Sequence, residues 1–390
     1  MRYQRKIQVL LVLLLTGFIS SYANDSLVMG QLLKRIDALQ SKQSGVFPKG
    51  IFPSYRLYAL NKDRQKADVN IFFTGLIAFT LKDIKQQLSP SQQKQAEQII
   101  SNTLPVYSKF KNQKGRPTYN FWPTDTPKIF PNAGWMNVFD KTQALPDDLD
   151  DTVIMLLALE AADSTARQVH DLMQSFTNNG GKQVQNTFKG YRNMAAYSTW
   201  FGKKMPVDFD VCVLANVLYF VQQYNLPWTH ADSASLQLIE KVLDERKHIT
   251  AAAYVSPHYS RLPNILYHLS RLMSVKPIPV LEKYKTQLIE DAKEALTKST
   301  NFLDEVILGT SLLRWGVIPP DVKTHTANSM DELIEGGSFS FFIANMASML
   351  PDPLKQWMGG AGVGKFYYYC PAYNNLLVLE YLAWKKKYSK

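Results

Sequence analysis

The chain has little cysteine, few strand-like stretches and no groove-like mixture of basic and aromatic residues. Two cysteines in 390 residues exclude a disulfide scaffold, so the core must hold the fold. We expect Cys212 and Cys370 to be unbridged, because they fall on well-separated helices of the fold predicted below. Basic residues do not alternate with aromatic ones as in a nucleic-acid site, so the formal charge of +11 indicates a solvated basic surface and no nucleic-acid partner.

The first residues have the pattern of a secretory signal peptide. Residues 1–6 are basic, residues 9–19 are almost entirely apolar, and Ser21 and Ala23 supply small side chains before a cleavage point. We predict a signal peptide over residues 1–23 and a periplasmic or secreted protein; a retained N-terminal anchor is the alternative. No later run approaches the roughly 18 apolar residues of a membrane span, so no stable span is expected after cleavage. The mature chain is expected to be a monomer.

Helical periodicity dominates the rest of the chain. Six times, an amphipathic segment is followed by one that is apolar on nearly all sides, and a helix of the second kind must be buried. We therefore predict an all-α fold, an (α/α)6 toroid of six inner and six outer helices in a single domain over residues 24–390, with a solenoid of helix pairs as the alternative. The predicted inner helices cover 69–81, 153–159, 208–218, 261–273, 302–315 and 373–384.

In such a ring every inner helix starts on the same face, so polar residues near those starts would share one concavity. Loops before them are rich in aromatic residues, including Tyr367 to Tyr369. Polar groups at a mouth with aromatic walls describe a pocket for a small molecule or a glycan. Taken singly, the same polar residues read equally well as helix caps. The predicted substrate-binding residues are Trp122, Trp135, Trp200, Asp208, Asp210, His258, Tyr259 and Tyr373.

An acidic segment, residues 146–152, opens the second inner helix. It holds Asp147, Asp148, Asp150 and Asp151, more carboxylates than a cap requires. Like charges this close raise the pKa of at least one carboxyl group unless donors or cations compensate. We assign Asp148, Asp150 and Asp151 as candidate catalytic residues. Mg²⁺ or Ca²⁺ at Asp147, Asp148 and Asp151 is a weaker possibility, because no second metal motif is present, and no cofactor is assigned.

Asp148 to Thr152 spells DxDDT and resembles the motif of class II terpene cyclases of the squalene–hopene type. Those enzymes are built from α/α toroids related to protein prenyltransferase subunits. The resemblance implies that Asp150 is the general acid that protonates an isoprenoid double bond, with Asp148 and Asp151 as its neighbours. Aromatic walls would then stabilise the carbocations that form.

Two other classes remain open. Exported (α/α)6 barrels are often glycoside hydrolases or polysaccharide lyases, and inverting hydrolysis needs two carboxyl groups about 6.5–9.5 Å apart. Asp150 or Asp151 facing Asp208 or Asp210 could form such a pair, whereas a lyase could use His258 and Tyr259 with Arg261. The third class is a non-catalytic binding or scaffold toroid. Whether the chain is an enzyme is therefore left open by the sequence.

Overall fold

The computed structural model describes residues 25–125, 146–202, 205–320, 322, 329–335 and 339–388, with the backbone alone for residues 62–64 and 330. The predicted signal peptide and Trp135 lie outside these residues. The described chain is mostly helical, and none of its helices is both long and apolar enough to cross a membrane.

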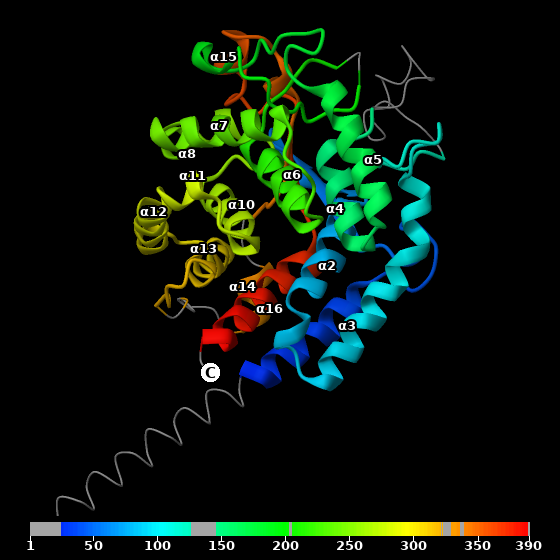
Figure 1. The fold of residues 1–390 in the computed structure, drawn as a ribbon. Helices are drawn as coiled ribbons and strands as arrows, with labels where there is room; N and C mark the ends of the chain where they lie inside the picture. Colours follow the sequence, from blue (N-terminus) through cyan, green and yellow to red (C-terminus); the bar gives the residue numbers. More distant parts are fainter. Residues whose placement is uncertain are drawn as a thin grey trace, which may run out of the picture.

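Six helices carry the apolar segments, and we call them the inner helices. Almost all of their residues are buried, because their sequences offer no polar face. Each packs against the next along the chain, and the last packs against the first (Figure 1). Cys212 and Cys370 are buried and free, as expected. The inner helices are α2 (Phe72–Asp83), α4 (Leu149–Leu159), α6 (Val211–Gln223), α10 (Leu262–Val275), α13 (Phe302–Arg314) and α16 (Pro371–Tyr388).

Amphipathic helices pack outside the inner ones. The helix α3 (Pro90–Thr103) contacts α2, α7 (His230–Asp244) contacts α6, and α12 (Lys285–Lys298) contacts α13. Capping boxes at Ser89 and Thr229 define where α3 and α7 begin. The remaining helical segments are residues 25–39, α5 (Asp163–Met173), α8 (Lys247–Thr250), α9 (Ala252–Val255), α11 (Pro279–Glu282), α14 (Met330–Glu335) and α15 (Leu354–Met358).

A four-stranded antiparallel sheet is also present, so the prediction of a purely helical chain was incomplete. The strands are β1 (Ser54–Tyr58), β2 (Asn61–Asp68), β3 (Ile343–Asn345) and β4 (Lys365–Tyr369), in the order β2-β1-β4-β3. Tyr367 to Tyr369, predicted as a loop, form part of β4. The central pair joins Tyr55 to Tyr369, so this strand pairing depends on partners very far apart in the sequence.

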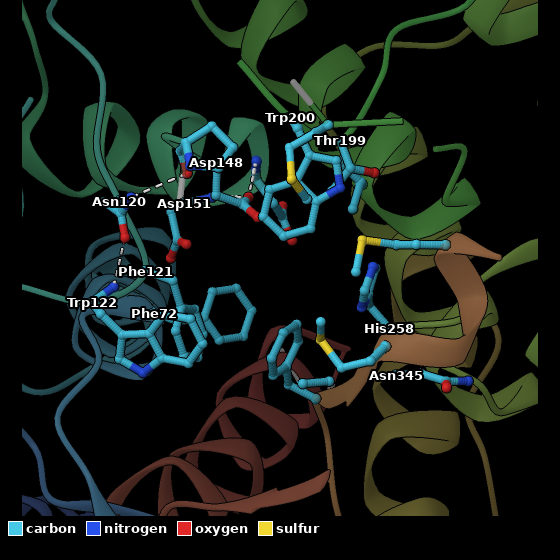
Figure 2. Close-up of a pocket in the computed structure, with 18 of the residues that line it drawn as sticks. Phe72, Asn120, Phe121, Trp122, Asp148, Asp151, Thr199, Trp200, His258 and Asn345 are labelled. Atoms are coloured by element: carbon cyan, nitrogen blue, oxygen red, sulfur yellow. Dashed lines mark hydrogen bonds between the residues drawn. The ribbon is translucent and has the colours of Figure 1, made fainter. Parts of the chain in front are cut away.

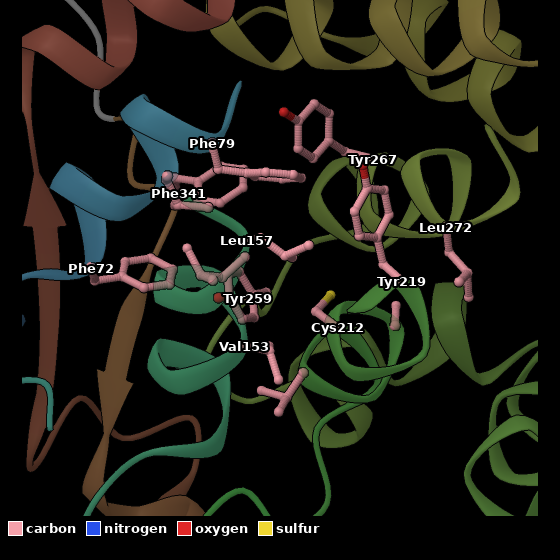
Figure 3. Close-up of a cluster of buried hydrophobic side chains, with 14 of the residues drawn as sticks. Phe72, Phe79, Val153, Leu157, Cys212, Tyr219, Tyr259, Tyr267, Leu272 and Phe341 are labelled. Atoms are coloured by element: carbon pink, nitrogen blue, oxygen red, sulfur yellow. The ribbon is translucent and has the colours of Figure 1, made fainter. Parts of the chain in front are cut away.

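Side chains from several inner helices meet in one core (Figure 3). The contact between α2 and α4 is especially close at Gly75, where an added Cβ would lie 1.6 Å from Cε of Met155. The helices approach this closely only because position 75 has no side chain.

Replacing Gly75 by alanine should lower the free energy of unfolding by about 1–3 kcal/mol, because the new methyl group overpacks the α2–α4 contact. Urea denaturation would measure the change. Gly45→Ala is the control, since an added Cβ there meets no atom within 4 Å; it should change the free energy of unfolding by less than about 0.5 kcal/mol. Equal effects of the two substitutions would contradict the close packing.

Candidate functional site

A pocket lies at the N-terminal end of α4, where three segments of chain meet. The N–H of Asp148 donates to the carbonyl of Tyr119 at 3.0 Å, and the N–H of Leu149 donates to the carbonyl of Thr199 at 2.9 Å. These bonds bring the loops that carry Trp122 and Trp200 to the acidic segment. The pocket encloses about 60 Å³ between described residues. Its lining includes Phe72, Asn120, Phe121, Trp122, Asp148, Asp150, Asp151, Thr199, Trp200, Met205, His258, Phe342, Asn345, Met346, Met349 and Tyr368 (Figure 2).

Three of the four carboxyl groups in the acidic segment have hydrogen-bond partners, and those of Asp148 and Asp147 have structural roles. Oδ1 of Asp148 caps α4 by accepting from the N–H groups of Asp150 at 2.7 Å and Asp151 at 3.1 Å. Oδ2 of Asp147 accepts from Nδ2 of Asn112 at 2.6 Å and from Oγ1 of Thr118 at 2.5 Å. Burial and the nearby charge of Asp150 raise the pKa of Asp148 to about 7. Helix capping therefore accounts for part of the excess of carboxyl groups in the acidic segment.

Asp150 is held from the side of α6 and α10. Its Oδ1 accepts from Nδ2 of Asn216 at 2.6 Å, and its Oδ2 accepts from the hydroxyl of Tyr259. Arg271 in turn donates to Oδ1 of Asn216. Burial raises the pKa of Asp150 to about 6 although the two hydrogen bonds oppose the rise. Sequence reasoning did not assign Asn216 to the site; its only signal was polarity inside an apolar helix.

Asp151 differs from its neighbours. It is 1% exposed, and neither of its carboxyl oxygens has a hydrogen-bond partner among the described residues. Burial raises its pKa well above 3.8, and the charges of Asp148 and Asp150 raise it further. Asp151 therefore keeps its proton to a higher pH than a free aspartic acid does, and it lies at the wall of the pocket.

His258 lies on the opposite wall from Asp148 and Asp151 (Figure 2). Its Nε2 is 3.4 Å from Oδ2 of Asp208, and its Nδ1 is 3.3 Å from the carbonyl oxygen of Ile343. Burial opposes a charge on this imidazole, but Asp208 and Asp210 outweigh burial and raise the pKa of His258 to about 9. His258 is therefore a buried cation paired with Asp208.

Four predicted substrate-binding residues do not line the pocket, and one of them is Tyr259, which donates to Asp150. Asp208 supports His258 without lining the pocket. Asp210 caps α6 through Cys212 and accepts from the backbone N–H of His258 at 2.9 Å. Tyr373 is buried in the core. Its ring packs against Phe73 at 5.6 Å and Phe341 at 4.9 Å.

Aromatic rings line the rest of the pocket. Phe121 stacks on Phe342 at 5.4 Å, and Phe342 stacks on His258 at 6.0 Å. The indole Nε1 of Trp122 donates to Asp68 at 3.0 Å, which fixes its ring. Phe342 and Asn345 come from the β3 segment, which no local sequence pattern connected with the acidic segment.

Metal binding at the acidic segment stays a prediction. Among the described residues, no group of three or more His, Cys, Asp and Glu side chains is arranged to hold a metal ion.

Comparison with known proteins gives no match to any family model, curated protein or solved structure. The resemblance to terpene cyclases therefore rests on the motif and on the predicted helix pattern.

Proposed function

We propose that this chain is an acid catalyst that protonates a carbon–carbon double bond, the step with which the resembled cyclases open an isoprenoid. One observation carries the proposal: the protonated carboxyl group of Asp151 lines a pocket with aromatic walls and has no other hydrogen-bond partner among the described residues. Protonating a double bond requires a carboxyl group that keeps its proton until the substrate is bound.

The pocket also suits the cation that protonation creates. The rings of Phe72, Trp122 and Phe342 offer π faces, which attract positive charge. After the proton leaves, Asp151 becomes a carboxylate facing that cation. In this proposal Asp151 delivers the proton and Asp150 is the positioning residue beside it, a different division of roles from the one the motif alone implied.

We further propose that these residues sit at the mouth of an (α/α)6 toroid, exported and cleaved after Ala23. The sequential contacts of the inner helices and the return contact from α16 to α2 support the toroid. The signal-peptide pattern supports export and a periplasmic or secreted site of action.

A carbohydrate-active enzyme is the second candidate, and a specific observation favours it. Trp200 places a buried indole Nε1 without a hydrogen-bond partner at the pocket, in the part of the chain that the structure describes. Donors beside aromatic faces are the usual means of holding a sugar.

The proposal is tested by exchange of solvent deuterium into unsaturated probes. In D₂O, the wild-type protein should place deuterium on carbon in at least one member of a set containing geraniol, squalene and D-glucal. Asp151→Asn should lower that rate by about 10²–10⁴-fold, because it removes the proton donor. Mass spectrometry of the recovered probes gives the rate.

Asp163→Asn is the matched control, since Asp163 is an exposed carboxylate in the first turn of α5 and should leave the rate unchanged. Circular dichroism would confirm that both variants are folded. Absence of deuterium from every probe, or equal rates for wild type and Asp151→Asn, would rule out the proposed chemistry.

A further inference from the structure

Unpartnered polar atoms converge on the pocket from three parts of the chain. They belong to Asp151 on α4, Trp200 before α6 and Asn345 on β3. The atoms are both carboxyl oxygens of Asp151, Nε1 of Trp200 and Oδ1 of Asn345, none with a hydrogen-bond partner among the described residues. A pure hydrocarbon would leave every one of them unpaired, at a cost in free energy. The ligand that fits this pocket therefore carries oxygen.

The charges around the pocket favour a ligand whose oxygen atoms are uncharged. His258 is the only cationic side chain among its described lining residues, and Asp208 already faces it. Asp148, Asp150 and Asp151 all line the same space. A phosphate or diphosphate group would meet acidic groups with no unpaired cation to balance them. Hydroxyl and ether oxygens accept from Nε1 of Trp200 without that cost.

The weak acidity of Asp151 also limits the kind of double bond that it can protonate. A carboxyl group that keeps its proton at neutral pH is a weak acid, and an isolated alkene accepts a proton very poorly. An enol ether accepts one far more readily, because its oxygen shares the positive charge of the resulting oxocarbenium ion. Asp151 is therefore better matched to a double bond conjugated with oxygen than to an isolated one.

Resting on the proposed function, we propose that the substrate is a cyclic enol ether, the class to which unsaturated sugars belong. Its ring oxygen faces Trp200, its double bond faces Asp151, and its hydroxyl groups reach Asn345. The cavity of about 60 Å³ is too small for an extended chain. The stacked pair of Phe121 and Phe342 supplies a flat apolar face for that ring.

The reaction balances as an addition of water. The π electron pair of the double bond forms a C–H bond with the proton of Asp151, leaving a carboxylate and an oxocarbenium ion. Water then adds to the carbon that bears the ring oxygen. Its surplus proton returns to the Asp151 carboxylate, which restores the acid, and nothing is oxidised or reduced.

D-glucal and geraniol, compared in D₂O, test the substrate class. D-glucal is a cyclic enol ether with three hydroxyl groups, whereas the double bonds of geraniol bear no oxygen. We expect the wild-type protein to convert D-glucal to 2-deoxyglucose with deuterium at C2, at least 100-fold faster than it labels geraniol. Trp200→Phe should raise the KM for D-glucal about tenfold or more, because it removes one donor while keeping a ring.

Trp228→Phe is the matched control, since Trp228 is exposed and remote from the pocket lining, and it should leave KM unchanged. Labelling of geraniol but not of D-glucal would overturn the enol-ether assignment while leaving the proposed acid catalysis intact. Labelling of neither probe, nor of squalene, would overturn both. An unchanged KM in Trp200→Phe would show that water alone satisfies the indole N–H.

Discussion

Replacing Arg314 by methionine is expected to lower the free energy of unfolding by about 3–5 kcal/mol. Arg314 on α13 donates to Oε1 of Glu380 on α16, and both side chains are 1% exposed. The hydroxyl of Tyr267 on α10 donates to Oε2 of the same carboxylate at 2.6 Å. Removing the guanidinium leaves Glu380 as a buried charge without its ion partner, which is the costly way to break such a pair.

Two further variants make this result interpretable. Arg314→Met combined with Glu380→Leu should recover most of the loss, because an apolar pair leaves no unpaired charge. Lys298→Met should cost less than about 1 kcal/mol, since its pair with Glu294 is exposed. Urea denaturation with a constant m-value measures all three. If Arg314→Met lowers the free energy of unfolding no more than Lys298→Met does, the Arg314–Glu380 pair with Tyr267 does not stabilise the packing of α10, α13 and α16.

The inner helices could be predicted because their signal is local. Residues 302–315 are apolar on nearly every side, and α13 occupies Phe302–Arg314. The predicted start of α2 was less accurate. The helix was predicted from residue 69, but β2 ends at Asp68 and the helix begins at Phe72. An apolar run indicates that a helix is buried but does not show where the preceding strand ends.

The sheet could not be predicted because the pairing that joins its two halves is not local. Tyr55 pairs with Tyr369 across most of the chain, whereas β1 pairs with β2 and β3 pairs with β4 between segments close in the sequence. Strands of three to eight residues carry too little alternation to be recognised alone. The consequence for the site is direct, since Phe342 and Asn345 reach the pocket only through this sheet.

Asp148, Asp150 and Asp151 of the acidic segment line a pocket, but the hydrogen-bond partners of each carboxyl group could not be predicted from the sequence. Asp148 is a cap because its backbone is extended before α4. Asp150 is partnered because Asn216 and Tyr259 arrive from other elements. Because these partners are distant in the sequence, only the structure shows that Asp151 is the carboxyl group without a hydrogen-bond partner among the described residues.

Raising the pH from 5 to 8 is expected to destabilise the protein, and Asp151→Asn is expected to remove much of that loss. A carboxyl group whose pKa is higher in the folded state binds its proton more tightly there. Its contribution to stability is complete below the unfolded pKa and is lost as the pH rises through the folded pKa. For Asp150, a rise from 3.8 to about 6 corresponds to about 3 kcal/mol.

Two other titratable groups, Asp148 and His258, also make the protein less stable as the pH rises from 5 to 8. Burial raises the pKa of Asp148 to about 7, so its contribution is lost mainly between pH 4 and 7. Asp208 and Asp210, outweighing burial, raise the pKa of His258 to about 9, so its contribution is lost between about pH 6.5 and 9. Asp232 acts oppositely, because hydrogen bonds from His170 and Thr229 outweigh burial and lower its pKa; its contribution is lost only under more acidic conditions.

Urea denaturation of wild type and Asp151→Asn at pH 5, 6, 7 and 8 measures these effects. At pH 8 the variant should be more stable than wild type, because an amide never ionises and burial disfavours the carboxylate. At pH 5 the difference between the two proteins should be smaller, because more of Asp151 is protonated there. Asp163→Asn should follow the wild-type curve at every pH. A wild-type protein equally stable at pH 5 and pH 8 would mean that these buried carboxyl groups do not hold their protons, and the acid proposed for catalysis would be lost with them.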